Sequence, residues 1–127
     1  MYFYIQRTKT TPSALINDGY MKIAGNAVPV EEQNFFGVFN KQIDRYIQKP
    51  NNKTSVDLSL TYVNASSKRQ IISMLNQLEA LANLGFDVEV NWYYEDDNED
   101  VKEFGEILDN MFAVTVNLIS NKNNREN

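Results

Sequence analysis

Cysteine and histidine are both absent from the 127 residues of the sequence. A chain without cysteine forms no disulfide and offers no thiolate, so it fits the reducing cytoplasm. A chain without histidine lacks the commonest general base and the commonest metal ligand of proteins. We therefore expect a cytoplasmic protein with no metal, no cofactor and no catalytic centre built on these two residue types.

Catalytic and targeting motifs are equally scarce. The sequence has no G-x-G-x-x-G and no phosphate-binding loop, and Ser66-Ser67-Lys68 lacks the S-x-x-K spacing of serine–lysine pairs. The segment from Met1 to Arg7 is apolar over only about five residues, which is too short for a signal-peptide core or a membrane span. These absences predict a protein that is not an enzyme and has no membrane partner.

Basic charge is also in deficit, with 12 Lys and Arg against 17 Asp and Glu and a net charge of −5. A surface for nucleic acid would show a basic stripe, so this balance favours protein partners and excludes DNA and RNA.

The acidic residues gather in the segment Glu95–Asp100, which lacks the spacing and the turn glycine of a dedicated calcium loop. We expect Asp96, Asp97 and Glu99 to be solvent-exposed and free of metal, because unpaired carboxylates are costly to bury.

Apolar periodicity is what the sequence does contain, and its period alternates along the chain between that of a strand and that of a helix. Asn17-Asp18-Gly19 between two short apolar runs predicts a β-hairpin, because glycine supplies the positive φ that the turn requires. The whole pattern predicts strands at 13–16, 20–25, 56–62, 87–94 and 113–119 and helices at about 31–48, 66–84 and 101–111.

These elements follow one another in the order β-β-α-β-α-β-α-β, which is typical of an α/β layer with a mixed β-sheet packed against helices. Helices separate the later strands, so we expect those strands to be parallel and joined by right-handed crossovers. No linker or internal repeat divides the chain. We therefore predict a single domain over 1–127, with 1–12 as a lead-in and 120–127 as a polar tail.

The same periodicity identifies the expected core. Val56, Leu58, Leu60 and Tyr62 are expected on one face of their strand, because they alternate with polar residues. Tyr93 alternates with its two aromatic neighbours, so we expect it on the outer face, where it can contact a partner. The residues predicted to be largely buried are Phe39, Ile43, Leu58, Leu60, Leu75, Leu78, Val90 and Leu108.

The change from strand to helix at Asn64-Ala65-Ser66-Ser67 is the point around which the chain is organised. Asn and Ser side chains accept hydrogen bonds from the free N–H groups of a first helical turn, and Asn64 is the expected cap. The same N–H groups and the positive end of the helix dipole favour an anion, such as a phosphate on a hydroxyl held there. The residues therefore fit a helix cap alone, and they also fit a regulatory phosphorylation site.

Five segments of the sequence, in order, resemble the SiaC family of bacterial regulatory phosphoproteins. The resemblance covers most of the chain and implies a STAS-like fold, that of anti-sigma-factor antagonists. It also implies a protein that is switched by a Ser/Thr kinase and a metal-dependent protein phosphatase, and whose unphosphorylated form binds and activates a diguanylate cyclase. The five segments are Gly25, Pro29-Val30-Glu31 leading to Phe35-Phe36, the segment Tyr62–Ser67, Val90–Tyr94, and Glu103-Phe104-Gly105-Glu106.

One position departs from the family. The phosphoacceptor of the family is the threonine of a Tyr-x-Asn-Thr-Ser-Ser motif, and Ala65 stands in its place here. Because Ala65 has no hydroxyl, either Ser66 or Ser67 takes the phosphate, or the protein stays permanently in its unphosphorylated, partner-binding state.

Together these observations predict a non-enzymatic regulatory protein of a bacterial partner-switching system, with a SiaC-like domain over 1–127. The alternative is a small-molecule or nucleotide-binding module. The residues expected to contact the partner are Tyr62, Asn64, Ser66, Ser67, Lys68 and Tyr93.

Overall fold

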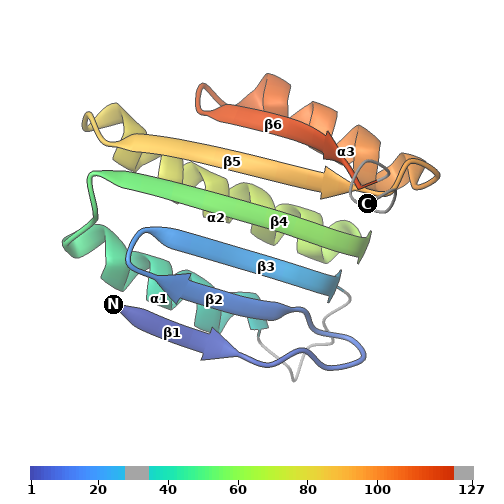
Figure 1. Ribbon diagram of the computed structural model, residues 1–127, viewed down its shortest axis with the longest axis horizontal. Helices are drawn as coiled ribbons and strands as arrows, with labels where there is room; N and C mark the ends of the chain where they lie inside the picture. Colours follow the sequence, from blue (N-terminus) through green and yellow to red (C-terminus); the bar gives the residue numbers. More distant parts are fainter. Residues whose placement is uncertain (28–34, 122–127) are drawn as a thin grey trace.

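The computed structural model describes residues 1–27 and 35–121. A six-stranded β-sheet has its strands in the order β1-β2-β3-β4-β5-β6 and packs against three helices (Figure 1). The α/β class predicted from the sequence is therefore confirmed. The elements are β1 (Tyr2–Ile5), β2 (Ser13–Asn17), β3 (Tyr20–Ala27), α1 (Phe35–Gln48), β4 (Lys53–Val63), α2 (Ala65–Asn83), β5 (Asp87–Tyr94), α3 (Glu99–Met111) and β6 (Thr115–Ser120).

The β2–β3 hairpin forms at the predicted turn. Asn17 and Tyr20 pair directly across it, and φ is 44° at Asp18 and 90° at Gly19. Positive φ at both central positions matches the twist of the paired strands, and Asp and Gly are residues that tolerate it. A Cβ at Gly19 would also lie 2.6 Å from the carbonyl oxygen of Lys53, so the turn requires glycine for space as well.

The strands from β3 to β6 are mutually parallel, as predicted, whereas β1 and β2 are antiparallel to their neighbours. Each connection between parallel strands contains one helix and moves the chain by one strand in the same direction. The helices cover one face of the sheet, and the face toward the viewer in Figure 1 is uncovered. We refer to this second face as the open face.

The core lies between the sheet and the helices. Strand residues alternate between this core and the open face, so that Val56 and Leu58 of β4 are buried while Asp57 between them is only half-buried. Trp92 is the largest of the fully buried side chains, and its Nε1 donates a hydrogen bond to the carbonyl oxygen of Val101 at 2.8 Å. The predicted core residues are all at most 3% exposed, which confirms the helix and strand phases: Phe39, Ile43, Leu58, Leu60, Leu75, Leu78, Val90 and Leu108.

The prediction of a lead-in over 1–12 is wrong for its first half. Tyr2–Ile5 forms β1, which pairs with β2 along one edge of the sheet. An isolated run of four strand residues is too short to establish a period in the sequence, and tertiary packing decides the outcome. Phe3 packs on the helix side of the sheet, with its ring centre 6.5 Å from that of Phe39.

Two further predictions concern the ends of elements. Strand β6 extends to Ser120, so the first residue of the predicted polar tail belongs to the sheet. Asn121 forms a turn after β6, and residues 122–127 lie outside the described residues, as do the first turn predicted for the helix at 31–48 and the segment Pro29-Val30-Glu31. No helix within the described ranges is long and apolar enough to cross a bilayer.

Candidate functional site

Strand β4 passes directly into α2 at the predicted junction. β4 ends at Val63 and α2 begins at Ala65, so Asn64 occupies the N-cap position. The Oδ1 of Asn64 accepts a hydrogen bond from the backbone N–H of Ser67 at 2.8 Å, and the Oγ of Ser67 accepts one from the backbone N–H of Asn64 at 2.8 Å. This reciprocal pair is a capping box, which fixes the direction in which the chain enters the helix.

The three residues that follow Asn64 differ sharply in accessibility. Ala65 and Ser66 are exposed, whereas Ser67 is 0% exposed. The Ser67 hydroxyl also donates to the carbonyl oxygen of Asn64 at 3.0 Å, so it acts as donor and acceptor within the capping box. Of the hydroxyls in this turn, only that of Ser66 is open to solvent.

Tyr62 is exposed just before the junction, and the prediction that it shares one strand face with Leu58 and Leu60 is wrong. The cause is a β-bulge, since Leu60 pairs with Gly25 and Tyr62 with Asn26, which leaves Thr61 as an extra residue in β4. An extra residue reverses the alternation of the strand. The Tyr62 side chain is 51% exposed as a result and lies on the surface close to the exposed first turn of α2.

Two contacts hold the start of α3 against this junction. Asn98, the N-cap of α3, donates a hydrogen bond from its Nδ2 to the carbonyl oxygen of Thr61 at 2.9 Å. The Nζ of Lys68 lies 5.6 Å from the centre of the Phe104 ring, within the range of a cation–π interaction. The starts of α2 and α3 therefore lie together at the end of the sheet where β4 and β5 terminate.

The first turns of these two helices differ in charge. α3 begins with Glu99 and Asp100, which suit the positive end of its own dipole, whereas α2 has no acidic residue in its first turn. Lys68 and Arg69 follow within α2. The start of α2 is therefore the one of the two that can take an added negative charge without repulsion inside its own first turn.

The acidic segment Glu95–Asp100 lies next to these strand ends. Asp96, Asp97 and Glu99 are exposed, as predicted. Within the two described ranges, the structure contains no group of three or more acidic, histidine or cysteine side chains arranged to hold a metal ion.

A second polar cluster lies on the open face of the sheet and was not predicted from the sequence. Asp57 is at its centre. Its Oδ2 accepts a hydrogen bond from the Tyr20 hydroxyl at 2.7 Å, and its Oδ1 accepts one from the Nδ2 of Asn91 at 2.9 Å. Asn117 in turn donates to the Oδ1 of Asn91 at 2.9 Å. Tyr93 is half-buried and, as its phase in β5 predicts, lies on the open face rather than at the junction.

The tyrosines of this cluster remain neutral. Burial and the hydrogen bond to Asp57 raise the pKa of Tyr20 to about 12. Burial and the charges of Asp57 and Glu89 raise the pKa of Tyr93. At neutral pH the phenols therefore keep their protons, and the charge of the cluster comes from its carboxylates.

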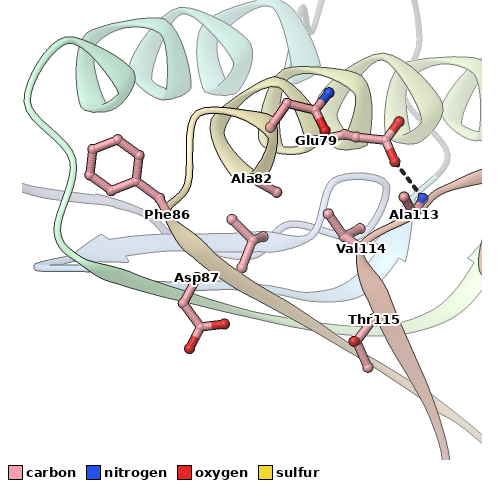
Figure 2. A pocket seen from close by; sticks show the side chains of 9 residues that line it. Glu79, Ala82, Phe86, Asp87, Ala113, Val114 and Thr115 are labelled. Carbon is pink, nitrogen blue, oxygen red and sulfur yellow. Dashed lines mark hydrogen bonds between the residues drawn. The ribbon is translucent and has the colours of Figure 1, made fainter.

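A pocket of about 320 Å³ lies at the other end of α2 (Figure 2). Glu79 accepts a hydrogen bond there from the backbone N–H of Ala113, which ties α2 to the chain that enters β6. None of the residues predicted to form the site reaches this pocket, so we attribute a structural role to Glu79. The lining residues are Glu79, Ala82, Asn83, Phe86, Asp87, Val88, Ala113, Val114 and Thr115.

The capping box leads to a first testable prediction. We expect Asn64→Ala to lower the free energy of unfolding by about 1 kcal/mol, because the substitution removes the acceptor for the Ser67 N–H. Urea unfolding followed by circular dichroism measures this difference. Asn76→Ala, at an exposed position in the same helix, is the matched control and should be neutral or slightly stabilising. Equal stabilities for the two variants would contradict a capping role for Asn64.

Comparison with known proteins identifies a family and a relative that resemble this chain. Residues 5–121 match the family described as SiaC family regulatory phosphoprotein. An uncharacterized protein of Pseudomonas aeruginosa (strain UCBPP-PA14) is 29% identical over 106 residues, which cover 81% of this chain and 83% of that protein.

Two solved structures have the same fold. The crystal structure of apo-SiaC from Pseudomonas aeruginosa superposes with a TM-score of 0.83 at 23% identity, covering 94% of this chain and 98% of the other. The crystal structure of the diguanylate cyclase SiaD in complex with its activator SiaC, from the same organism, gives a TM-score of 0.85 at 24% identity, covering 93% and 98% of the two chains. The family match extends over β2 to β6 and all three helices. This chain therefore belongs to the SiaC family of regulatory phosphoproteins.

Proposed function

We propose that this chain is a cytoplasmic, non-enzymatic regulator that binds a diguanylate cyclase or a related signalling enzyme. The binding surface lies at the end of β4, where that strand passes into α2. Phosphorylation of Ser66 by a Ser/Thr kinase blocks this binding, and a metal-dependent protein phosphatase restores it. The whole described fold acts as one SiaC-like domain. A relative supports the class of partner, since SiaC of Pseudomonas aeruginosa is named as the activator of the diguanylate cyclase SiaD.

The observation that carries this proposal is the contrast between the two serines. The Ser67 hydroxyl is buried and makes hydrogen bonds to both the backbone N–H and the carbonyl of Asn64. A kinase would have to break the capping box to reach it. Ser66 is exposed one residue after Ala65, in a first turn without acidic residues. Ser66 is thus the hydroxyl that can replace the missing threonine.

A phosphate on Ser66 would leave the helix intact. It would add about −1.5 to −2 charges at the positive end of the α2 dipole, where negative charge is stabilising. The phosphate would instead weaken the binding of a partner, because an interface over Ser66 and the exposed Tyr62 ring would have to remove water from that charge. Phosphorylation of Ser66 would therefore weaken partner binding and leave the fold unchanged.

The test is a titration of the host's diguanylate cyclases with wild-type protein and with Ser66→Asp, read out as cyclic di-GMP synthesis. We expect Ser66→Asp to weaken activation at least about tenfold, or about 1.4 kcal/mol of binding free energy, with an unchanged melting temperature. Ser66→Ala should activate as well as wild type. Ser73→Asp, which adds the same charge at an exposed position further along α2, is the matched control and should also activate normally.

A second arm examines the kinase directly. Phosphopeptide mass spectrometry of the protein purified from its host should find phosphate on Ser66 and none on Ser67. Ala65→Thr restores the family hydroxyl at an exposed position, and we expect it to be a better kinase substrate with unchanged activation of the cyclase. Full activation by Ser66→Asp, or loss of its fold, would contradict the proposed switch.

A further inference from the structure

The open face of the sheet carries a built cluster of side chains that the proposed regulatory junction does not use. In register across β3, β4, β5 and β6 stand Lys22, Asp57, Asn91 and Asn117. Tyr20 reaches Asp57 diagonally from β3, and Tyr93 stands two residues beyond Asn91 on β5. Figure 1 views the sheet from this side, with no helix in front of it.

Hydrogen bonds fix the orientation of Asp57. Each of its two oxygens accepts one bond, at 2.7 Å from Tyr20 and at 2.9 Å from Asn91. A carboxylate has about four acceptor positions, so each oxygen retains capacity for another donor. Asn91 is itself held by Asn117, which keeps the row rigid. The carboxylate is therefore preorganised and still able to accept two more hydrogen bonds.

Within the part of the chain that the structure describes, no cation is paired with the acids of this cluster. Among residues 1–27 and 35–121, the structure contains no ion pair to Asp57 or Glu89, although Lys22 is the register neighbour of Asp57. Glu89, Asn91 and Tyr93 alternate along β5 and therefore share the open face with Asp57, which pairs with Asn91 in the register. Tyr20 and Tyr93 are only half-buried, so part of each ring is accessible beside these acids.

Aromatic rings beside an oriented carboxylate suit one side chain better than any other. A guanidinium group is planar, stacks on tyrosine rings and donates two parallel hydrogen bonds to a carboxylate. An ammonium group is a compact, strongly hydrated charge that matches neither feature as well. A cationic ligand would also relieve the unpaired negative charge of Asp57 and Glu89.

We propose that the open face binds an arginine side chain presented by a partner protein, with Asp57 accepting the guanidinium and Tyr20 and Tyr93 contacting its planar faces. We commit to a different protein as the partner, since two copies that met open face to open face would offer each other no arginine from their six strands. This second surface does not depend on phosphorylation at the junction, so its test stands apart from that of the proposed switch.

The experiment uses nuclear magnetic resonance of the full chain with three short peptides, Gly-Arg-Gly, Gly-citrulline-Gly and Gly-Lys-Gly, each with blocked ends. Citrulline has nearly the shape of arginine without its charge. We expect amide shifts confined to β3, β4 and β5 around Asp57 with the arginine peptide. The lysine peptide should bind at least severalfold more weakly, and the citrulline peptide should produce no saturable shift.

Two variants locate the site. Asp57→Asn keeps a side chain of the same shape and should weaken binding of the arginine peptide at least tenfold. Tyr93→Leu leaves the carboxylate in place and should weaken binding severalfold. Asp109→Asn removes an exposed acid from α3, on the covered side of the sheet, and should leave binding unchanged. Folding of each variant is checked by its melting curve and amide spectrum, and Tyr93→Leu decides the matter if Asp57→Asn unfolds.

Several outcomes would overturn the proposal. Equal binding of the lysine or citrulline peptide would remove the preference for a guanidinium. Shifts located away from the open face, or unaffected by both variants, would exclude this site. Shifts at the same residues that grow with protein concentration in the absence of peptide would assign the face to a second copy of the chain.

Discussion

Gly105→Ala is expected to destabilise the protein by about 3 kcal/mol, at the upper end of the usual cost of overpacking. Gly105 lies in α3 and is buried against the sheet. A Cβ at this position would collide with the indole of Trp92, at 2.6 Å from Nε1, and would lie 2.8 Å from the Cδ2 of Leu118. Moving the indole would break its hydrogen bond to the carbonyl of Val101, so Trp92 cannot yield at low cost.

The sign of this effect is what makes the prediction sharp. In an exposed helix, glycine to alanine stabilises by about 1 kcal/mol, because alanine is the better helix former. Urea unfolding of Gly105→Ala should show a loss, whereas Glu106→Ala, at the exposed next position, should show little change. In a Trp92→Ala background, which removes the whole indole, the added cost of Gly105→Ala should shrink. A stabilised Gly105→Ala variant would refute the packing of α3 described above.

Leu75→Ala should cost roughly 2–5 kcal/mol, since it leaves a cavity in the middle of the core. Leu75 is 0% exposed and lies on the face of α2 that packs against the sheet. Leu84, at the end of the same helix, is 74% exposed. Leu84→Ala therefore makes the same chemical change without a cavity, and we expect it to cost less than about 0.5 kcal/mol. Thermal and urea unfolding of the two variants measures the difference, and similar losses at both sites would contradict the burial of α2.

The junction between β4 and α2 could be predicted from the sequence because its signals are local. The period of apolar residues changes within a few positions, and Asn64 stands where a cap is needed. The three-residue spacing from Asn64 to Ser67 is also the spacing of a capping box, and it carried the information that separates Ser67 from Ser66. The accessibility of the two hydroxyls follows from that spacing.

Features that depend on pairing between distant strands could not be predicted. The exposure of Tyr62 follows from a bulge whose position is set by the register with Gly25 in another strand. β1 forms only because β2 offers an edge to pair with and the core accepts Phe3. Neither partner is visible from the residues of the strand itself, because strand formation depends on context more than helix formation does.

The sequence contains a sign of the open-face cluster, but apolar periodicity alone does not predict that its residues meet. Asp57 and Asn91 are polar residues at the centre of their strands, each between two buried apolar residues. Alternation explains why they face outward. That they stand side by side and share hydrogen bonds with Tyr20 follows only from the parallel pairing of β4 with β5 and of β3 with β4.

The strands lie side by side in the same order in which they occur in the sequence, and this arrangement has a consequence for biosynthesis. Every strand pairs with the strand made just before it, so no pairing spans more than one helix and each can form as soon as that helix and the next strand have left the ribosome. The growing edge of the sheet is covered by the next strand to emerge, which limits the time for which its backbone groups are open to other chains. Translation from the first residue onward thus adds strands in the sequence in which the finished sheet arranges them, and β6 closes the structure last.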